Sequence, residues 1–99
     1  MANRKISWSK TAIKQFEAAI IYIASDSAVN AEKVAGDILQ DLEKTILNPE
    51  FFPPDKYKLG NTGNYRAFER HHYRVSYKVN NNVIRVLRIR HTGMEPKGY

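Results

Sequence analysis

Residues 65–91 read YRAFERHHYRVSYKVNNNVIRVLRIRH, and this stretch decides the fold. From Tyr73 to Val79 apolar and polar side chains alternate with a period of two, which is the pattern of a β-strand with one buried and one solvated side. The asparagines at 80–82 separate this run from a second β-branched run. They predict a tight reversal, because asparagine tolerates the backbone angles of tight turns. The stretch therefore predicts two or three short antiparallel strands.

The last of these strands does not keep a single register. Ile84 and Val86 share one parity, whereas Leu87 and Ile89 have the other. In a regular strand the two pairs would point to opposite faces of the sheet. A β-bulge near Val86 and Leu87 would reconcile them, and so would a strand that is covered on both faces.

The residues before this stretch predict one strand and two helices. Residues 4–8 alternate weakly and predict a short first strand. After Ser9, which is a suitable N-cap, apolar residues recur every three or four positions over 12–23 and again over 31–46. Pro49 ends the second helix, because the residue before proline avoids helical backbone angles. We interpret both apolar stripes as core.

A helix pair of this kind needs a second layer, which the strands supply. We predict an α+β fold: an N-terminal strand, then an antiparallel helix hairpin packed on one face of a C-terminal antiparallel sheet whose other face is open. Its 99 residues, 42% of them hydrophobic, are enough for a single domain, 1–99. Residues 48–64 form a long connection, which Phe51, Phe52 and Tyr57 are expected to pin. The residues after Arg90 predict a short tail at the edge of the open face.

Composition limits the function classes. The absence of cysteine excludes disulfides, thiolate metal sites and cysteine nucleophiles. No signal core and no run of ~20 apolar residues is present, so we expect a soluble cytoplasmic protein that makes no use of a membrane. Residues 1–55 carry six Lys/Arg against eight Asp/Glu, whereas residues 56–99 carry ten against two. A basic C-terminal half favours a polyanionic partner, either nucleic acid or an acidic polypeptide.

Metal and nucleotide sites have little support. Of the three histidines, the adjacent His71 and His72 would point to opposite faces of a strand, whereas a zinc site needs converging ligands. No glycine-rich loop precedes a helix. We therefore expect neither a metal nor a small-molecule cofactor.

The remaining candidates are basic and aromatic residues of the C-terminal half. They are Arg66, Arg70, Arg74, Arg88, Arg90 and Lys97, with His91, Tyr73 and Tyr99. Arginine can hold phosphate through two hydrogen bonds, and histidine or an activated tyrosine can transfer a proton. Alternation places Arg74 on the solvated face, opposite Val75, so its role is expected to be functional rather than structural. The same residues could cleave RNA or bind an acidic protein segment, and the residues alone do not favour one of these functions over the other.

These segments resemble a known family over nearly the whole chain. The matching features are a first strand, a helix pair ending at Asn48-Pro49, the YRVSY strand at 73–77, the IRVLRIRH run at 84–91 and Met94-Glu95-Pro96. Together they resemble the RelE/ParE superfamily of bacterial toxins. The resemblance implies the toxin of a type II toxin-antitoxin module, held inactive by a cognate acidic antitoxin that wraps its surface.

The resemblance implies one of two activities. RelE-like members cleave mRNA on the ribosome without metal, whereas ParE-like members block DNA gyrase. In the first case the catalytic candidates would be Arg74, His91 and Tyr99. The residues expected to bind RNA or the target are Arg66, Arg70, Arg88, Arg90 and Lys97.

The ParE-like branch is favoured. Ala67 and Phe68 stand where the nuclease branch would have a lysine, and the ending His91-Thr-Gly-Met94 looks closer to ParE. A plain nucleic-acid-binding module is a weaker alternative, because Tyr73 and Tyr77 share the parity of Val75 and so are expected to face the helices instead of stacking bases.

Overall fold

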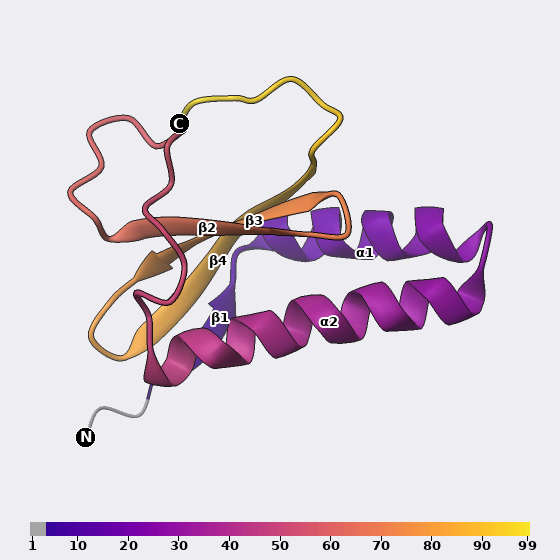
Figure 1. The fold of residues 1–99 in the computed structure, drawn as a ribbon, viewed down its shortest axis with the longest axis horizontal. Coiled ribbons are helices and arrows are strands. Elements are labelled where there is room, and N and C mark those ends of the chain that lie inside the picture. The colour runs from indigo at the N-terminus through magenta and orange to yellow at the C-terminus, as the bar shows by residue number, and fades with distance from the viewer. Residues whose placement is uncertain (1–3) are drawn as a thin grey trace.

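The structure is a computed structural model that describes residues 4–99 (Figure 1). The elements are β1 (Lys5–Trp8), α1 (Lys10–Ala24), α2 (Ala28–Leu47), β2 (Tyr65–Arg70), β3 (Tyr73–Val79) and β4 (Val83–His91). One sheet has the strand order β1-β4-β3-β2, and the two helices pack on one of its faces. The predicted α+β architecture is confirmed. Its unforeseen feature is that β1 pairs with β4 in parallel, whereas the other pairings are antiparallel.

The helices begin where their capping residues predict. Ser9 accepts a hydrogen bond from the Ala12 N–H at 3.0 Å, and Ser27 accepts one from the Asn30 N–H at 3.1 Å. Helix α2 buries Val34, Ile38 and Leu42 against the sheet. In α1 only Ala12 is fully buried, and Ile13 is 44% exposed. The interpretation of the first stripe as plain core is therefore wrong in part.

A β-bulge resolves the mixed parity of β4. Ser76 pairs with Arg88 but the next residue, Tyr77, pairs with Val86, so Leu87 is the additional residue. The bulge lets Ile84, Val86 and Ile89 all become buried, at 0%, 0% and 3% exposure. A side chain of α1 satisfies a backbone donor of the bulged strand, because the Ile89 N–H donates to Gln15 Oε1 at 2.7 Å.

The turn between β2 and β3 contradicts the placing of His71 and His72 in a strand. These two residues form the reversal between the paired residues Arg70 and Tyr73, with φ of 50° and 68°. Two positive φ angles make it a type I′ turn, which matches the twist of antiparallel strands. The predicted reversal at 80–82 does join β3 to β4, but its asparagines do not adopt positive φ.

The second face of the sheet is not fully open, in contrast to the prediction. The connection at 48–64 runs beside β2, where the Asp55 N–H donates to the Tyr65 carbonyl at 2.8 Å. The tail then pairs with this connection, because the Tyr99 N–H donates to the Tyr57 carbonyl at 3.0 Å and the Leu59 N–H to the Tyr99 carbonyl at 2.7 Å. Figure 1 shows the connection rising from the end of α2 past β2, so that its later part lies with the tail on the side away from α2. We call this side the far face.

Within residues 4–99, no helix combines the length and the apolar character needed to cross a membrane.

Candidate functional site

Strand register divides the predicted arginines between the two faces of the sheet. Arg66 and Arg70 pair with Tyr77 and Tyr73, whose side chains belong to the core on the helix side. On the far face, Glu69, Arg74 and Arg90 are partners in one row across the strands, and Arg88 follows in the next row beside Ser76. The basic set therefore does not form a single surface.

Arg66 and Arg70 stabilise the fold. The Arg66 guanidinium donates to the carbonyls of Gly63 at 3.1 Å and Phe52 at 2.9 Å, which anchors the connection. Arg70 lies 3.5 Å from Asp37 and 3.8 Å from Asp41, both on α2.

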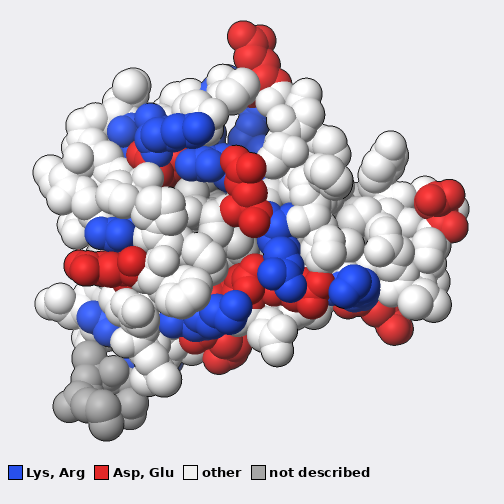
Figure 2. Space-filling model, in the orientation of Figure 1, with Lys and Arg blue, Asp and Glu red and all other residues white. Residues whose placement is uncertain are grey.

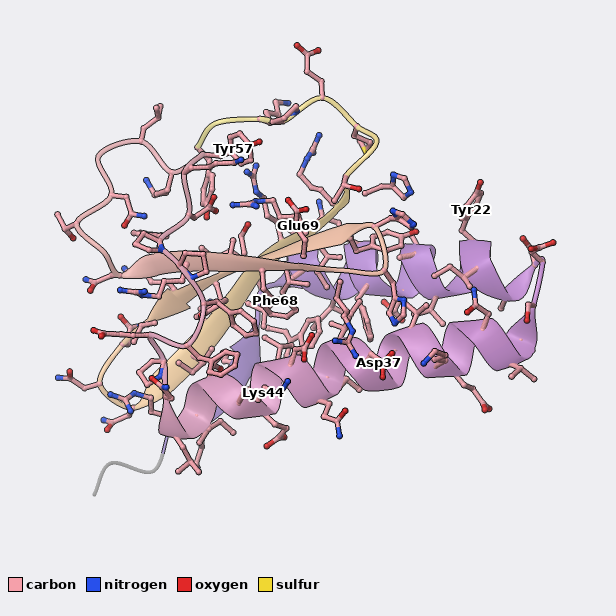
Figure 3. The ribbon with its side chains drawn as sticks, in the orientation of Figure 1. Tyr22, Asp37, Lys44, Tyr57, Phe68 and Glu69 are labelled. Atoms are coloured by element: carbon pink, nitrogen blue, oxygen red, sulfur yellow. The ribbon has the colours of Figure 1, made fainter. Side chains whose placement is uncertain are left out.

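The turn residue His71 adds to this link between the sheet and α2. Its Nε2 is 2.6 Å from the Asp37 carboxylate, and this hydrogen bond is the main reason that the pKa of Asp37 is lowered. Acidic and basic side chains lie side by side over α2 in Figure 2, and Figure 3 shows Asp37 on the side of α2 near the sheet.

The centre of the far-face site is Asp55, which sequence reasoning missed. Its side chain is fully buried. It accepts hydrogen bonds from Arg74 Nη2 at 2.8 Å, from the Tyr99 hydroxyl at 2.7 Å and from the Tyr57 N–H at 3.0 Å. Burial opposes ionisation, but these donors outweigh it, and the pKa of Asp55 lies below its usual value. No periodicity marks an aspartate in an irregular connection, so the sequence carries no signal for this role.

Arg74 lies on the predicted face but not in solvent. Its side chain is only 16% exposed. Besides Asp55 it binds Glu69 at 3.0 Å, and its guanidinium lies 4.8 Å from the centre of the Tyr57 ring. Burial opposes the charge, but the hydrogen bonds to Asp55 and Glu69 and the charges of these carboxylates together outweigh it and raise the pKa of Arg74. The expected solvent exposure of Arg74 is therefore wrong, since Arg74 neutralises a buried carboxylate, and its functional role stays a prediction.

Tyr99 is held in the same cluster. Burial and its hydrogen bond to Asp55 raise the pKa of the Tyr99 hydroxyl. The Arg88 guanidinium lies 4.1 Å from the centre of the Tyr99 ring, and Arg88 Nη2 donates to the Lys97 carbonyl at 2.6 Å. Tyr99 thus stays protonated at neutral pH and fixes the tail to the sheet.

A small pocket of about 50 Å³ opens beside this cluster. Its basic lining residues are Arg74, Arg88, Arg90, His91 and Lys97, with Glu69 as the acidic one. His91 is exposed, and its Nδ1 accepts a hydrogen bond from the Gly93 N–H at 2.9 Å. The structure therefore brings together six predicted residues: Arg74, Arg88, Arg90, His91, Lys97 and Tyr99. The volume suits one small anionic group rather than a nucleotide.

The arrangement favours binding over proton transfer. Both oxygens of Asp55 are occupied and buried, the Tyr99 hydroxyl is engaged, and Arg74 faces two carboxylates. Within residues 4–99, no three His, Asp or Glu side chains converge in a way that would hold a metal ion. Among the three catalytic candidates within residues 4–99, only His91 is exposed.

The family of the chain follows from a match over residues 6–96. The matching model is that of the ParE toxin of type II toxin-antitoxin systems, parDE. The chain belongs to this family. The prediction of a RelE/ParE superfamily toxin is thereby confirmed, and this ParE-family chain is a type II toxin.

Solved structures agree on the fold. The ParE-family chain resembles a chain of the chromosomal ParDE system from P. aeruginosa, with a TM-score of 0.67 and 17% identity over 90% of this chain and 96% of that one. It also resembles the YoeB dimer from Staphylococcus aureus, with a TM-score of 0.61 and 20% identity over 91% of this chain and 98% of the YoeB chain. No curated protein sequence matches the chain. At these identities the likeness concerns the fold alone.

Proposed function

We propose that this ParE-family toxin inhibits DNA gyrase and does not cleave RNA. The observation that carries the proposal is the buried carboxylate of Asp55, which occupies both Arg74 and Tyr99. The family match to ParE supports the same choice.

RNA cleavage needs a base to activate the ribose 2′-hydroxyl and a cation to stabilise charge on the phosphate. Tyr99 is a poor base, because its raised pKa keeps the proton on its hydroxyl. Arg74 is a poor phosphate ligand, because Asp55 and Glu69 already neutralise it. Two of the three catalytic candidates are thus committed to the fold.

The alternative, a ribosome-dependent mRNA endonuclease, rests on His91. This residue lines the pocket together with Arg90 and Lys97, so a proton-transfer group lies beside two cations. A nuclease built on this site would depend on His91 and not on Tyr99.

We also propose a cognate acidic antitoxin as the partner. The similar structure from P. aeruginosa is described as a ParDE toxin-antitoxin system. In this chain the incompletely buried stripe of α1 offers a docking surface, since Trp8, Ile13, Phe16 and Leu39 line an apolar groove between the helices and β1. An apolar groove of this kind accepts the apolar face of an amphipathic helix. Gyrase and the ribosome are both inside the cell, so the proposal includes a cytoplasmic location.

Two assays on the purified protein separate the activities. In a gyrase supercoiling reaction we expect loss of supercoiling, and in a translation reaction with mapping of mRNA ends we expect intact mRNA. His91→Gln should retain gyrase inhibition, since glutamine keeps hydrogen bonding but cannot transfer a proton near neutral pH. mRNA cuts that vanish in His91→Gln, with gyrase unaffected by the wild type, would establish the nuclease instead.

A further inference from the structure

Five basic side chains cross the far face of the sheet at the end where β3 turns into β4. They are Lys5, Lys58, Lys78, Arg85 and Arg88, and we call them the basic strip. Lys78 and Arg85 are direct partners on β3 and β4, and Arg85 is in turn the partner of Ser7 on β1. Lys5 lies two residues before Ser7, so both side chains point to the same face. Lys58 joins from the connection, over the ring of Tyr65.

The charges of the basic strip are not neutralised. Every ion pair within residues 4–99 uses a carboxylate of Asp37, Asp41, Asp55 or Glu69, and none includes a member of the strip. Arg88 belongs both to the strip and to the lining of the pocket, but the other four members lie outside the pocket, where Glu69 and Asp55 compete for Arg74.

Tyrosine rings position three of the five cationic groups, and Arg85 Nη1 donates to the Ser7 hydroxyl at 2.6 Å. Lys58 and Lys78 lie 4.7 Å and 5.3 Å from the centre of the Tyr65 ring, and Arg88 lies over Tyr99. Cation–π contacts of this kind hold a cation in place without removing its charge.

The surroundings of the strip favour nucleic acid over protein. Protein interfaces depend on buried apolar anchors, whereas interfaces with nucleic acid are more polar and much more positively charged. Within residues 4–99, the large apolar side chains that are exposed lie on the helices, the 48–64 connection and the tail, and none lies on a strand. The apolar groove at α1 suits a protein partner, and it is on the other side of the sheet.

We propose that the basic strip binds the phosphate backbone of duplex DNA without reading its sequence. The choice of duplex DNA rests on the proposed function, because gyrase acts on duplex DNA and a toxin bound to that complex lies beside it. The strip has members on β1, β4 and β3, and Lys58 lies over Tyr65 of β2. With strands about 4.8 Å apart, the strip crosses roughly 15 Å, a span along which duplex DNA presents several phosphates. No helix projects from the far face, so no element enters a groove to read base edges.

The test measures how binding to a labelled duplex of 30 base pairs of mixed sequence depends on salt concentration. Fluorescence anisotropy reports the binding, and gyrase is absent. Five phosphate contacts predict a slope of log affinity against log salt of about −4.5. Replacing two members, K78Q with R85Q, should reduce the slope to about −2.7 and weaken binding at least tenfold near 100 mM salt. The matched control, K10Q with K14Q, removes the same charge from exposed positions on α1 and should leave the slope unchanged. Urea midpoints of both variants show that they are folded.

Three results would overturn the inference. They are no binding of the duplex at 25 mM salt, equal slopes for K78Q/R85Q and K10Q/K14Q, and tighter binding of a single-stranded RNA with the same number of phosphates. Failure of the proposed function is visible separately. If the wild type inhibits gyrase but does not bind the duplex, only the DNA-binding surface is refuted, and if it binds with the expected slopes but spares gyrase, only the target is refuted.

Discussion

Asp55 shows how one buried charge can assign roles to its neighbours. Its carboxylate is fully buried, and it binds the side chains of Arg74 from β3 and Tyr99 from the tail. The 48–64 connection, β3 and the tail, which are distant in sequence, are thereby joined at one carboxylate. A residue with this position affects stability first, and activity only through the groups that it holds.

We expect Arg74→Ala to lower the free energy of unfolding by about 3 kcal/mol, because it leaves the Asp55 charge buried without its main partner. Asp55→Ala and Arg74→Ala should not be additive. In the double variant the free energy of unfolding should fall by at least about 1 kcal/mol less than the sum of the decreases in the two single variants. Arg90→Ala is the matched control, since Arg90 is the β4 partner of Arg74 and makes no ion pair within residues 4–99; its effect should be within about 0.5 kcal/mol. Urea denaturation measures all four variants, and strictly additive losses would contradict the coupling.

Asp55 also predicts a dependence of stability on pH. Its pKa is lowered in the folded protein, so between the folded and unfolded pKa values the unfolded chain binds more protons, and stability rises with pH there. The contribution is complete above the unfolded value of about 3.9 and is lost as pH falls through the folded one. Denaturation of the wild type and of Asp55→Asn from pH 2 to 6 should show a smaller loss in the variant, which lacks this carboxylate. Parallel curves for the two proteins would exclude Asp55 as the cause.

At the scale of the element, the β2–β3 turn is made from two residues that are poorly suited to it. Residues other than glycine and asparagine pay about 1–2 kcal/mol for left-handed backbone, yet His71 and His72 both adopt it. His71 is compensated by its bond to Asp37, whereas the His72 side chain is exposed. The two positions should therefore respond differently to glycine.

We expect His72→Gly to stabilise the protein by about 0.5 kcal/mol, since relief of the left-handed backbone exceeds the added entropy of the unfolded chain. His71→Gly is the contrast, and it should be neutral or destabilising because it removes the hydrogen bond to Asp37. Urea midpoints of the two variants decide this, and a destabilised His72→Gly would show that the ring contributes more than its exposure suggests.

The exposed side of α1 leads to a prediction about the antitoxin. Ile13→Glu places a charge in the apolar groove and should weaken antitoxin binding at least tenfold, with gyrase inhibition retained. Val29→Glu is the control, because Val29 is 79% exposed and does not line the groove. Calorimetric titration with the cognate antitoxin measures both, and equal affinities for the two variants would remove the groove as the docking surface.

For the whole molecule, periodicity in the sequence is enough to predict the helices, the strands and the α+β class, because burial on one face imposes a period on the chain. It reveals the mixed parity of β4 but does not decide between a bulge and a strand covered on both faces. It does not predict the pairing of β1 with β4, since a parallel neighbour needs no sequence signal of its own. The candidate site is predicted in part. Arg74, Arg88 and Tyr99 are candidates from the sequence and do lie together, but Asp55 lies in an irregular segment whose path only tertiary contacts determine.

The parallel pairing of β1 with β4 also determines when the toxin can exist. Lys5 and Ile6 pair with Val83 and Ile84. The first strand can therefore join the sheet only after the last strand has been made. During synthesis the helix hairpin can form early from local contacts, whereas the basic strip, which draws on β1, β3 and β4, is assembled only after β4 has left the ribosome. The groove proposed for the antitoxin includes Trp8 of β1, so this groove and the basic strip are completed at the same step of folding.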